Sequence, residues 1–300
     1  MSPSDSIINL LTSALAEDLG EEGDITTAAI FDADDAGEAL IRCKQKGVLS
    51  GITLVAPLFG LVDKYLASHI SSASAALPVT TVEAYCADGD PVEPGKAVCR
   101  ITGAVRSILA GERTILNLIQ RLSGIATLTS AMVRELSSGG AKTRLLDTRK
   151  TTPGMRALEK AAVRHGGGVN HRAGLYDMIL IKDTHVKRAG GITEALAKAL
   201  AWRGDSATPK IEVEAQSIIE FVSALRLKPD RIMLDNMSPK EIEICVDERD
   251  ASGLKIELEA SGNITLGILS AIAATNVDYI SCGAITHSAP ALDFHLVMLS

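Results

Sequence analysis

The basic residues of this chain are concentrated in one segment. Residues 142–188 contain eleven Lys and Arg residues against four Asp and Glu residues, a balance of +7 in a chain whose formal net charge is -7. Three of these cations, Arg149, Lys150 and Lys182, close apolar runs that resemble strands. A cation at the end of a buried strand needs an anionic partner, because removing a charge from water is costly. That partner is either an internal carboxylate or a bound anion.

Two further residues of the same segment favour a bound anion. His171 and Arg172 follow a run of glycines at 166–168. A guanidinium recognises planar carboxylates and phosphates with two hydrogen bonds, so the cluster predicts a small ligand with several negative charges. The internal carboxylates that could instead pair with the strand-end cations are Asp147, Asp183 and Glu214.

Two later segments indicate a phosphate. EASGNIT (259–265) and SCGAITHS (281–288) each place small residues and a glycine after a strand and before a helix or turn. Backbone N–H groups in such a turn, and the positive end of a helix, receive phosphate. In barrels the phosphate site commonly follows the last two strands, which is where these segments fall. A tight turn without a ligand is the alternative for each segment.

Two carboxylates end neighbouring strands. Glu214 closes the run KIEVE and Asp235 closes the run RIMLD, with Asn236 directly after it. Beside a phosphate-rich ligand these carboxylates could bind Mg²⁺ held mainly by the ligand, contact ribose hydroxyls, or stabilise positive charge on a sugar carbon. They could equally neutralise the Arg and Lys cluster.

The elements that must position these residues alternate between short apolar segments and amphipathic helices. The steps between Lys182, Glu214, Asp235, Glu259 and Cys282 are 32, 21, 24 and 23 residues, about the length of one βα unit. This rhythm predicts a parallel sheet. No GxGxxG or P-loop motif supports a doubly wound sheet, and a barrel would gather all the strand ends at one mouth. Six strands are predicted, with a candidate seventh near 166–172: 143–150, 178–183, 210–214, 231–236, 255–262 and 278–283.

The first half of the chain has a different pattern. A helix that ends near Gly20 precedes short alternating runs between about 37 and 103, which predict an antiparallel sheet with a helix around 53–68. A long helical stretch from about 107 to 136 makes a plausible connection to a second domain.

Composition excludes several classes of protein. With 300 residues and 46% apolar content, the chain can bury one large core or two smaller ones. Its negative charge and nine aromatic residues argue against nucleic-acid binding. The longest apolar stretch, 47–62, is too short to span a bilayer. The five scattered cysteines and a first helix without Lys or Arg favour a cytoplasmic protein with no disulfide framework and no targeting segment.

The motifs of the basic segment resemble those of one family. TRKTTPG (148–154), GGGVNHR (166–172) and IKD (181–183) are similar to the signature of quinolinate phosphoribosyltransferase, also called nicotinate-nucleotide pyrophosphorylase (carboxylating). Further segments match in order over nearly the whole chain: 17–27, 111–127, 211–214, 232–236, 259–265 and 281–293.

The resemblance implies a fold and a reaction. The fold is α/β, with an N-terminal α/β sandwich domain at 1–116, an incomplete six- or seven-stranded α/β barrel at 117–286, and a tail at 287–300 that returns to the first domain. The pyridine nitrogen of quinolinate attacks C1 of phosphoribosyl pyrophosphate in the presence of Mg²⁺. Pyrophosphate leaves, and loss of the 2-carboxylate as CO2 gives nicotinate mononucleotide in de novo NAD biosynthesis.

The resemblance also assigns roles to residues of this chain. Quinolinate would be held by Arg113, Arg149, His171, Arg172 and Lys182, with Arg113 contributed by the neighbouring subunit of a homodimer or a higher oligomer. Lys150, Glu214 and Asp235 would be the catalytic residues. The two carboxylates would lie beside Mg²⁺ that is bound through the substrate pyrophosphate. Phosphoribosyl pyrophosphate would be held by Thr148, Lys150, Glu214, Asp235, Ser261, Gly262, Asn263, Cys282, Gly283, Ala284 and His287.

Two positions depart from the family pattern, and three other functions compete. Thr184 stands where Asn is frequent, and Asn263 stands where Gly often does. The alternatives are a phosphosugar-processing barrel in which Lys182 forms a Schiff base, a related pyrophosphorylase-like protein linked to molybdate transport, and an inactive nucleotide-binding scaffold.

Overall fold

The computed structural model describes residues 5–69, 77–138 and 142–299. The chain forms two compact units. The first comprises residues 1–128, 153–166 and 289–300, and the second comprises residues 129–152 and 167–288. The domain boundaries expected from the sequence stay predictions.

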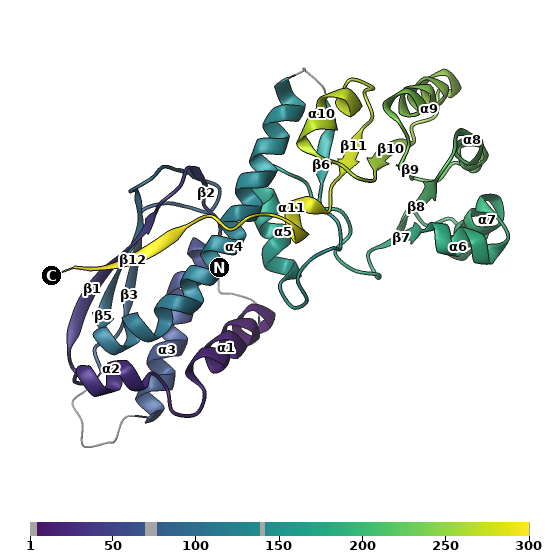
Figure 1. The fold of residues 1–300 in the computed structure, drawn as a ribbon. Coiled ribbons are helices and arrows are strands. Elements are labelled where there is room, and N and C mark those ends of the chain that lie inside the picture. Colours follow the sequence, from purple (N-terminus) through teal and green to yellow (C-terminus); the bar gives the residue numbers. More distant parts are fainter. Residues whose placement is uncertain (1–4, 70–76, 139–141, 300) are drawn as a thin grey trace. The chain divides into compact units, whose positions relative to one another are not determined.

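The first unit is built on a four-stranded antiparallel sheet in the order β12-β1-β5-β3 (Figure 1). Strand β12 pairs with β1 from Glu38 opposite Leu299 to Cys43 opposite Phe294, so the end of the chain completes the sheet. The strands are β1 (Ala36–Cys43), β3 (Thr81–Ala84), β5 (Ala97–Ala104) and β12 (Phe294–Leu299), beside the short pair β2 (Gly47–Val48) and β4 (Pro91–Val92).

Three helices lie where the apolar periodicity predicted them: the opening helix, the helix around 53–68 and the long helix are all confirmed. They are α1 (Asp5–Leu19), α3 (Val55–His69) and α4 (Val105–Ser138), and residues 129–138 of α4 belong to the second unit. The first unit also contains α2 (Ile25–Ile30), α5 (Arg156–His165) and a 3₁₀ turn η1 (Ile52–Leu54) before α3. A partly buried ion pair joins α4 and α5, since Arg121 Nη2 on α4 lies 3.0 Å from Glu159 Oε1 on α5.

The second unit is a six-stranded parallel sheet in the order β6-β11-β10-β9-β8-β7. The predicted α/β architecture with six parallel strands is confirmed. Its strands are β6 (Arg144–Leu146), β7 (Met178–Ile181), β8 (Lys210–Ala215), β9 (Arg231–Asp235), β10 (Glu257–Ser261) and β11 (Tyr279–Ser281). The intervening helices are α6 (Asp183–Ala189), α7 (Ile192–Arg203), α8 (Ile218–Leu227), α9 (Pro239–Ser252), α10 (Leu266–Ala273) and α11 (Ala284–His287).

The sheet is open at its two edges, β6 and β7, within the described residues. The candidate seventh strand near 166–172 contributes one parallel bridge, between Val169 and Leu146 of β6. Val169 N donates to Leu145 O, and Asp147 N donates to Val169 O. This short pairing brings the segment that ends in His171 and Arg172 alongside the strand that leads into Arg149.

The strands of the second unit carry charge on alternate positions. Ile211 and Val213 of β8 are fully buried, whereas Glu212 and Glu214 point to the opposite face of the sheet. The same alternation in β9 buries Ile232 and leaves Asp235 on the other face. Because the strands are parallel, their carboxyl ends meet at one edge.

The long helix and the C-terminal segment approach each other closely. A Cβ on Gly124 of α4 would lie 2.0 Å from the carbonyl oxygen of Pro290 and 3.1 Å from Ala291 Cα.

Among the described residues, no helix has the length and apolar character that crossing a bilayer requires.

We predict that Gly124→Ala destabilises the protein, because the new methyl group meets backbone that cannot rotate away. Overpacking of this kind typically costs about 1–3 kcal/mol. Differential scanning calorimetry should show a lower midpoint of unfolding. Gly60→Ala is the matched control, since Gly60 lies in helix α3 with no atom within 4 Å of the added Cβ. This variant should be neutral or up to about 1 kcal/mol more stable, and equal midpoints for the two variants would contradict the prediction.

Candidate active site

A cavity of about 620 Å³ opens at the carboxyl ends of the strands in the second unit. This volume suits a small-molecule ligand. Its wall contains every site residue predicted from the sequence except Arg113. These are Thr148, Arg149, Lys150, His171, Arg172, Lys182, Glu214, Asp235, Ser261, Gly262, Asn263, Cys282, Gly283, Ala284 and His287.

Arg113 belongs to the first unit. Its side chain is exposed on helix α4 and is not part of the cavity wall. The predicted contribution of Arg113 from a neighbouring subunit stays a prediction.

Lys182 has an internal partner. Its Nζ lies 2.9 Å from Glu214 Oε1, and Asp183 N donates to Glu214 Oε2 at 3.1 Å. The Glu214 side chain is 9% exposed and that of Lys182 is 43% exposed. Both residues line the cavity. Of the three internal carboxylates considered for the strand-end cations, Glu214 is therefore the one that Lys182 uses.

Two cations in the cavity wall have no carboxylate partner. Neither Arg149 nor Arg172 forms an ion pair within 4.0 Å among the described residues. Arg172 Nη1 instead donates to Met178 O at 3.0 Å. Burial and the neighbouring charge of Arg149 lower the pKa of Arg172. Two like charges held together in a partly dry cavity favour an anionic ligand.

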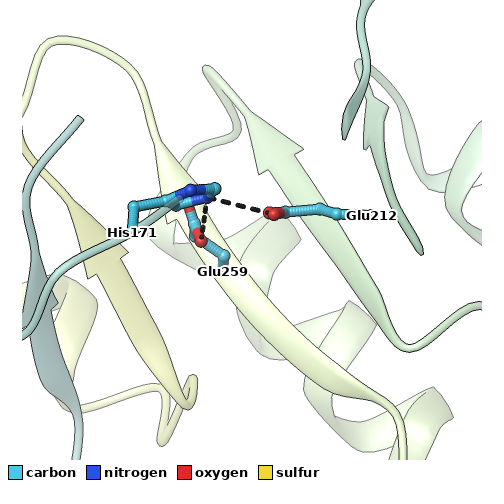
Figure 2. A group of neighbouring side chains, drawn as sticks. All are labelled: His171, Glu212 and Glu259. Atoms are coloured by element: carbon cyan, nitrogen blue, oxygen red, sulfur yellow. Dashed lines mark ion pairs between the residues drawn. The ribbon is translucent and has the colours of Figure 1, made fainter. Parts of the chain in front are cut away.

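A second group of charges lies deeper. His171 Nε2 is 3.0 Å from Glu212 Oε2 and 3.3 Å from Glu259 Oε2, and Figure 2 shows the ring facing both carboxylates. Both glutamate side chains are fully buried. Arg231 Nη1 lies 2.9 Å from Glu259 Oε2, which brings a further positive charge to the cluster. We call His171, Glu212, Glu259 and Arg231 the floor cluster.

The floor cluster binds more protons than isolated groups would. Burial would lower the pKa of His171, but Glu212 and Glu259 outweigh burial and raise it to about 9. Burial and the charge of Glu259 raise the pKa of Glu212 to about 7. Arg172 N donates to His171 Nδ1 at 2.7 Å, a contact that fits a neutral ring with its hydrogen on Nε2. Because His171 and Glu212 titrate together, the extra proton belongs to the pair and not to one residue.

The same geometry disfavours a metal ion in the floor cluster. His171, Glu212 and Glu259 place one ligand atom each within 4.8 Å of one another, a spacing that could hold a metal. A metal would have to bind His171 Nε2, yet the backbone donor at Nδ1 places the ring hydrogen on Nε2. Arg231 already supplies a positive charge to Glu259. The groups therefore suit a hydrogen-bonded cluster.

The turn after β10 brings the backbone of Gly262 close to the side chain of Asn236. Gly262 has φ 106° and Asn263 has φ 49°, both in the left-handed region. A Cβ on Gly262 would lie 2.1 Å from Asn236 Oδ1, so only glycine fits there. Asn tolerates the left-handed region better than most residues, which accounts for Asn263 at a position where the family often has Gly.

The turn after β11 differs from the sequence-based expectation in one respect. The helix that follows it, α11, has only four residues, so its dipole is small. Lys150 and His287 pack over this turn, because a Cβ on Gly283 would lie 2.8 Å from Lys150 Cδ and 3.2 Å from His287 Nε2. Thr286 Oγ1 donates to Lys150 O at 2.8 Å and holds the two segments together.

Sequence reasoning missed the functional potential of Glu212 and Arg231. A signal was present, because Glu212 stands two residues before Glu214, between the apolar residues Ile211 and Val213. In β8 these two side chains share one face, so the deeper carboxylate must be buried beneath the shallower one.

Comparisons with known proteins identify similar chains over the whole length. The C-terminal domain of quinolinate phosphoribosyl transferase matches residues 125–297, and its N-terminal domain matches residues 24–123. Quinolinate phosphoribosyltransferase [decarboxylating] 1b of Nicotiana tabacum is 38% identical, covering 98% of this chain and 83% of that protein. A probable nicotinate-nucleotide pyrophosphorylase [carboxylating] of Bacillus subtilis is 40% identical over 96% of this chain and 91% of its own length.

Solved structures show the same similarity. The nicotinate-nucleotide pyrophosphorylase of Francisella tularensis superposes with a TM-score of 0.86 at 38% identity, covering 100% of this chain and 98% of that one. The match therefore includes both units.

We predict that the extra proton of the floor cluster makes stability depend on pH. The pKa values of about 9 for His171 and about 7 for Glu212 exceed their ordinary values of 6.5 and 4.5, so the folded state binds protons more tightly than the unfolded chain. The stability that this binding contributes is complete below the ordinary values and is lost as pH rises through the raised ones. The midpoint of thermal unfolding should therefore fall between about pH 7 and about pH 9.

Glu212→Gln is the informative comparison for this effect. It removes one titrating carboxyl group and leaves His171 beside a single glutamate. Scanning calorimetry from neutral to alkaline pH should show a flatter dependence in the variant than in the wild type. An equal slope in both proteins would contradict the assignment of the proton to this cluster.

Proposed function

The chain belongs to the quinolinate phosphoribosyltransferase family, and from that premise we propose how its cavity divides between two substrates. The enzyme is a nicotinate-nucleotide pyrophosphorylase (carboxylating). It transfers the phosphoribosyl group from phosphoribosyl pyrophosphate to quinolinate with decarboxylation, in de novo NAD biosynthesis.

In our proposal, quinolinate binds at the side of the cavity lined by Arg149, Arg172 and Lys182. The observation that carries this assignment is the pair of guanidinium groups without a carboxylate partner among the described residues. A substrate with two carboxylates supplies the missing negative charge, and planar guanidinium groups orient it. His171 lies in the same wall, with Nδ1 receiving the Arg172 N–H and Nε2 facing two glutamates. Its direct contact with quinolinate stays a proposal.

Phosphoribosyl pyrophosphate occupies the opposite side in this proposal. The turn at 261–263 and the turn at 282–284 with His287 receive the 5′-phosphate, and Thr148 and Lys150 contact the pyrophosphate. Lys150 is exposed, and no side-chain ion pair of Lys150 occurs among the described residues, which suits a group that meets an anionic substrate.

Catalysis in this arrangement needs no protein nucleophile. The pyridine nitrogen of quinolinate is itself the nucleophile, so the residues act by positioning and by electrostatic stabilisation. Glu214 and Asp235 face the cavity where positive charge develops on the sugar carbon. Lys182 fixes the orientation of Glu214 through its 2.9 Å ion pair.

We propose Mg²⁺ as the metal, held mainly by the substrate's pyrophosphate. Carboxylate oxygens are the donors that Mg²⁺ prefers, and Asp235 and Glu214 supply them. Asp235 suits this role better, since its side chain has a single hydrogen-bond partner among the described residues, Gln216 Nε2 at 3.3 Å. Both oxygens of Glu214, in contrast, accept from Lys182 and Asp183. When bound, the ion neutralises charge on the leaving pyrophosphate.

We also propose a homodimer and a cytoplasmic location. The exposure of Arg113 on helix α4 leaves its guanidinium available to a neighbouring subunit. The five cysteines are free and buried, which suits a reducing compartment.

The Schiff-base alternative is not favoured. A Lys that attacks a carbonyl needs a free amine, whereas the Lys182 amine is engaged with Glu214 Oε1 at 2.9 Å. The relatives named as quinolinate phosphoribosyltransferases cover most of this chain, which also argues against the molybdate-linked paralogue.

We predict that the enzyme prefers quinolinate over nicotinic acid. Nicotinic acid lacks the second carboxylate and would leave one guanidinium unpaired in the cavity. Loss of a desolvated charge pair lowers kcat/KM by on the order of a hundredfold or more. Chromatographic detection of nicotinate mononucleotide, with each acid supplied alongside phosphoribosyl pyrophosphate and Mg²⁺, measures this. Preferential turnover of nicotinic acid would refute the assignment.

We predict that two inactive variants complement each other if Arg113 acts across a dimer. Arg113→Ala and Lys182→Ala should each lose activity with quinolinate. Random exchange makes about half of the dimers mixed, and one of the two sites in each mixed dimer is intact, so about a quarter of wild-type activity should return. Absence of recovery in dimers shown to exchange subunits would exclude a shared site.

A further inference from the structure

The floor cluster buries carboxylate oxygens that have few hydrogen-bond donors around them. Both oxygens of Glu212 are buried, and among the described residues the only side chain that pairs with them is His171, whose Nε2 lies 3.0 Å from Glu212 Oε2. Burying such groups is costly, and native proteins usually satisfy them. A cluster with this cost needs a physical reason to persist.

Glu212 depends on His171 more than Glu259 does. Arg231 donates to Glu259 Oε2 at 2.9 Å, whereas the only ion pair of Glu212 among the described residues is with His171. Glu212 is also absent from the cavity wall, although His171 is part of it. Any influence of Glu212 on a ligand must therefore pass through His171.

His171 in turn is tied to Arg172. The Arg172 N–H donates to His171 Nδ1 at 2.7 Å, and the Arg172 guanidinium donates to Met178 O at 3.0 Å. The backbone N–H of His171 donates to Asp147 Oδ1 at 2.8 Å, so the main chain at His171 is also held in place. Rotation of the imidazole would release the backbone contact that orients Arg172.

We propose that Glu212, supported by Glu259, is a positioning residue for quinolinate that acts through His171 on Arg172. The inference rests on the proposed function, because it assumes that Arg172 contacts quinolinate. The two glutamates hold the imidazole at Nε2, the imidazole receives the backbone N–H at Nδ1, and the guanidinium is thereby held toward the cavity. The chain of contacts serves the quinolinate side of the cavity and leaves the side of phosphoribosyl pyrophosphate untouched.

The test compares steady-state kinetics of the wild type and Glu212→Gln with each substrate varied in turn. The amide keeps the shape of the side chain and removes its charge. We expect the KM for quinolinate to rise about tenfold, which corresponds to about 1.4 kcal/mol. We expect the KM for phosphoribosyl pyrophosphate to stay within about twofold, because a general loss of structure would raise both.

A double-mutant cycle shows whether Glu212 acts through His171. In a His171→Ala background, Glu212→Gln should change the quinolinate KM by less than about twofold, since the connecting group is absent. An equal effect of Glu212→Gln in both backgrounds would overturn the proposal. If Glu212→Gln does not fold, the same double-mutant cycle is measured with Glu259→Gln, and its outcomes are interpreted in the same way.

Glu257→Gln is the matched control. Glu257 lies on β10, the strand of Glu259, pairs with Arg231 at 3.0 Å, and forms no ion pair with His171 among the described residues. It should leave the quinolinate KM within about twofold of wild type. A tenfold rise in this control would assign the effect to loss of charge in the sheet interior and overturn the specific role of Glu212.

The outcomes separate this inference from the proposed function. A wild-type protein that does not use quinolinate refutes the proposed function, and the inference with it. An active wild type whose Glu212→Gln variant retains its quinolinate KM refutes only the positioning role.

Discussion

The active site depends on how the second unit neutralises the charge that its strands carry into the interior of the sheet. A buried ion is tolerated only with a partner of opposite charge, because desolvation costs several kcal/mol. Arg231 meets this requirement through Glu257 and Glu259, and its guanidinium also lies 4.2 Å from the ring centroid of Tyr279. Lys182 meets it through Glu214. Arg149 and Arg172 lack such a partner among the described residues, so the charge left over is directed at the cavity.

The floor cluster likewise compensates the charge of its two buried glutamates. In the proposed complex a substrate with two carboxylates binds above two buried glutamates, and like charges at short range in a poorly solvated site repel strongly. Arg231 compensates Glu259, and the extra proton shared by His171 and Glu212 compensates the second carboxylate. The floor is then close to neutral, so the guanidinium groups in the wall determine the potential that the substrate experiences.

Much of this arrangement could be predicted from the sequence, because the positions and the ends of strands follow from local patterns. Apolar runs closed by a polar or charged residue located the six parallel strands, and parallel strands bring such residues to one edge. The partners of the charges could not be predicted in the same way. Which carboxylate pairs with Lys182, and that His171 turns toward Glu212 and Glu259, depend on side-chain packing between strands distant in sequence. The place of Arg113 relative to the cavity is a question about assembly, which local patterns do not address.

Glu212 and Glu214 show how depth within a sheet changes the role of one residue type. They lie two positions apart on β8, so both point to the same face and differ in height by about 6.6 Å. Glu214 reaches the cavity and accepts from Lys182, whereas Glu212 lies below the wall and faces His171. A sequence motif that contains both carboxylates does not reveal this difference, because only the strands on either side determine which one a ligand can reach. The deeper carboxylate influences the substrate only through a side chain that spans the two levels, and His171 is placed to do so.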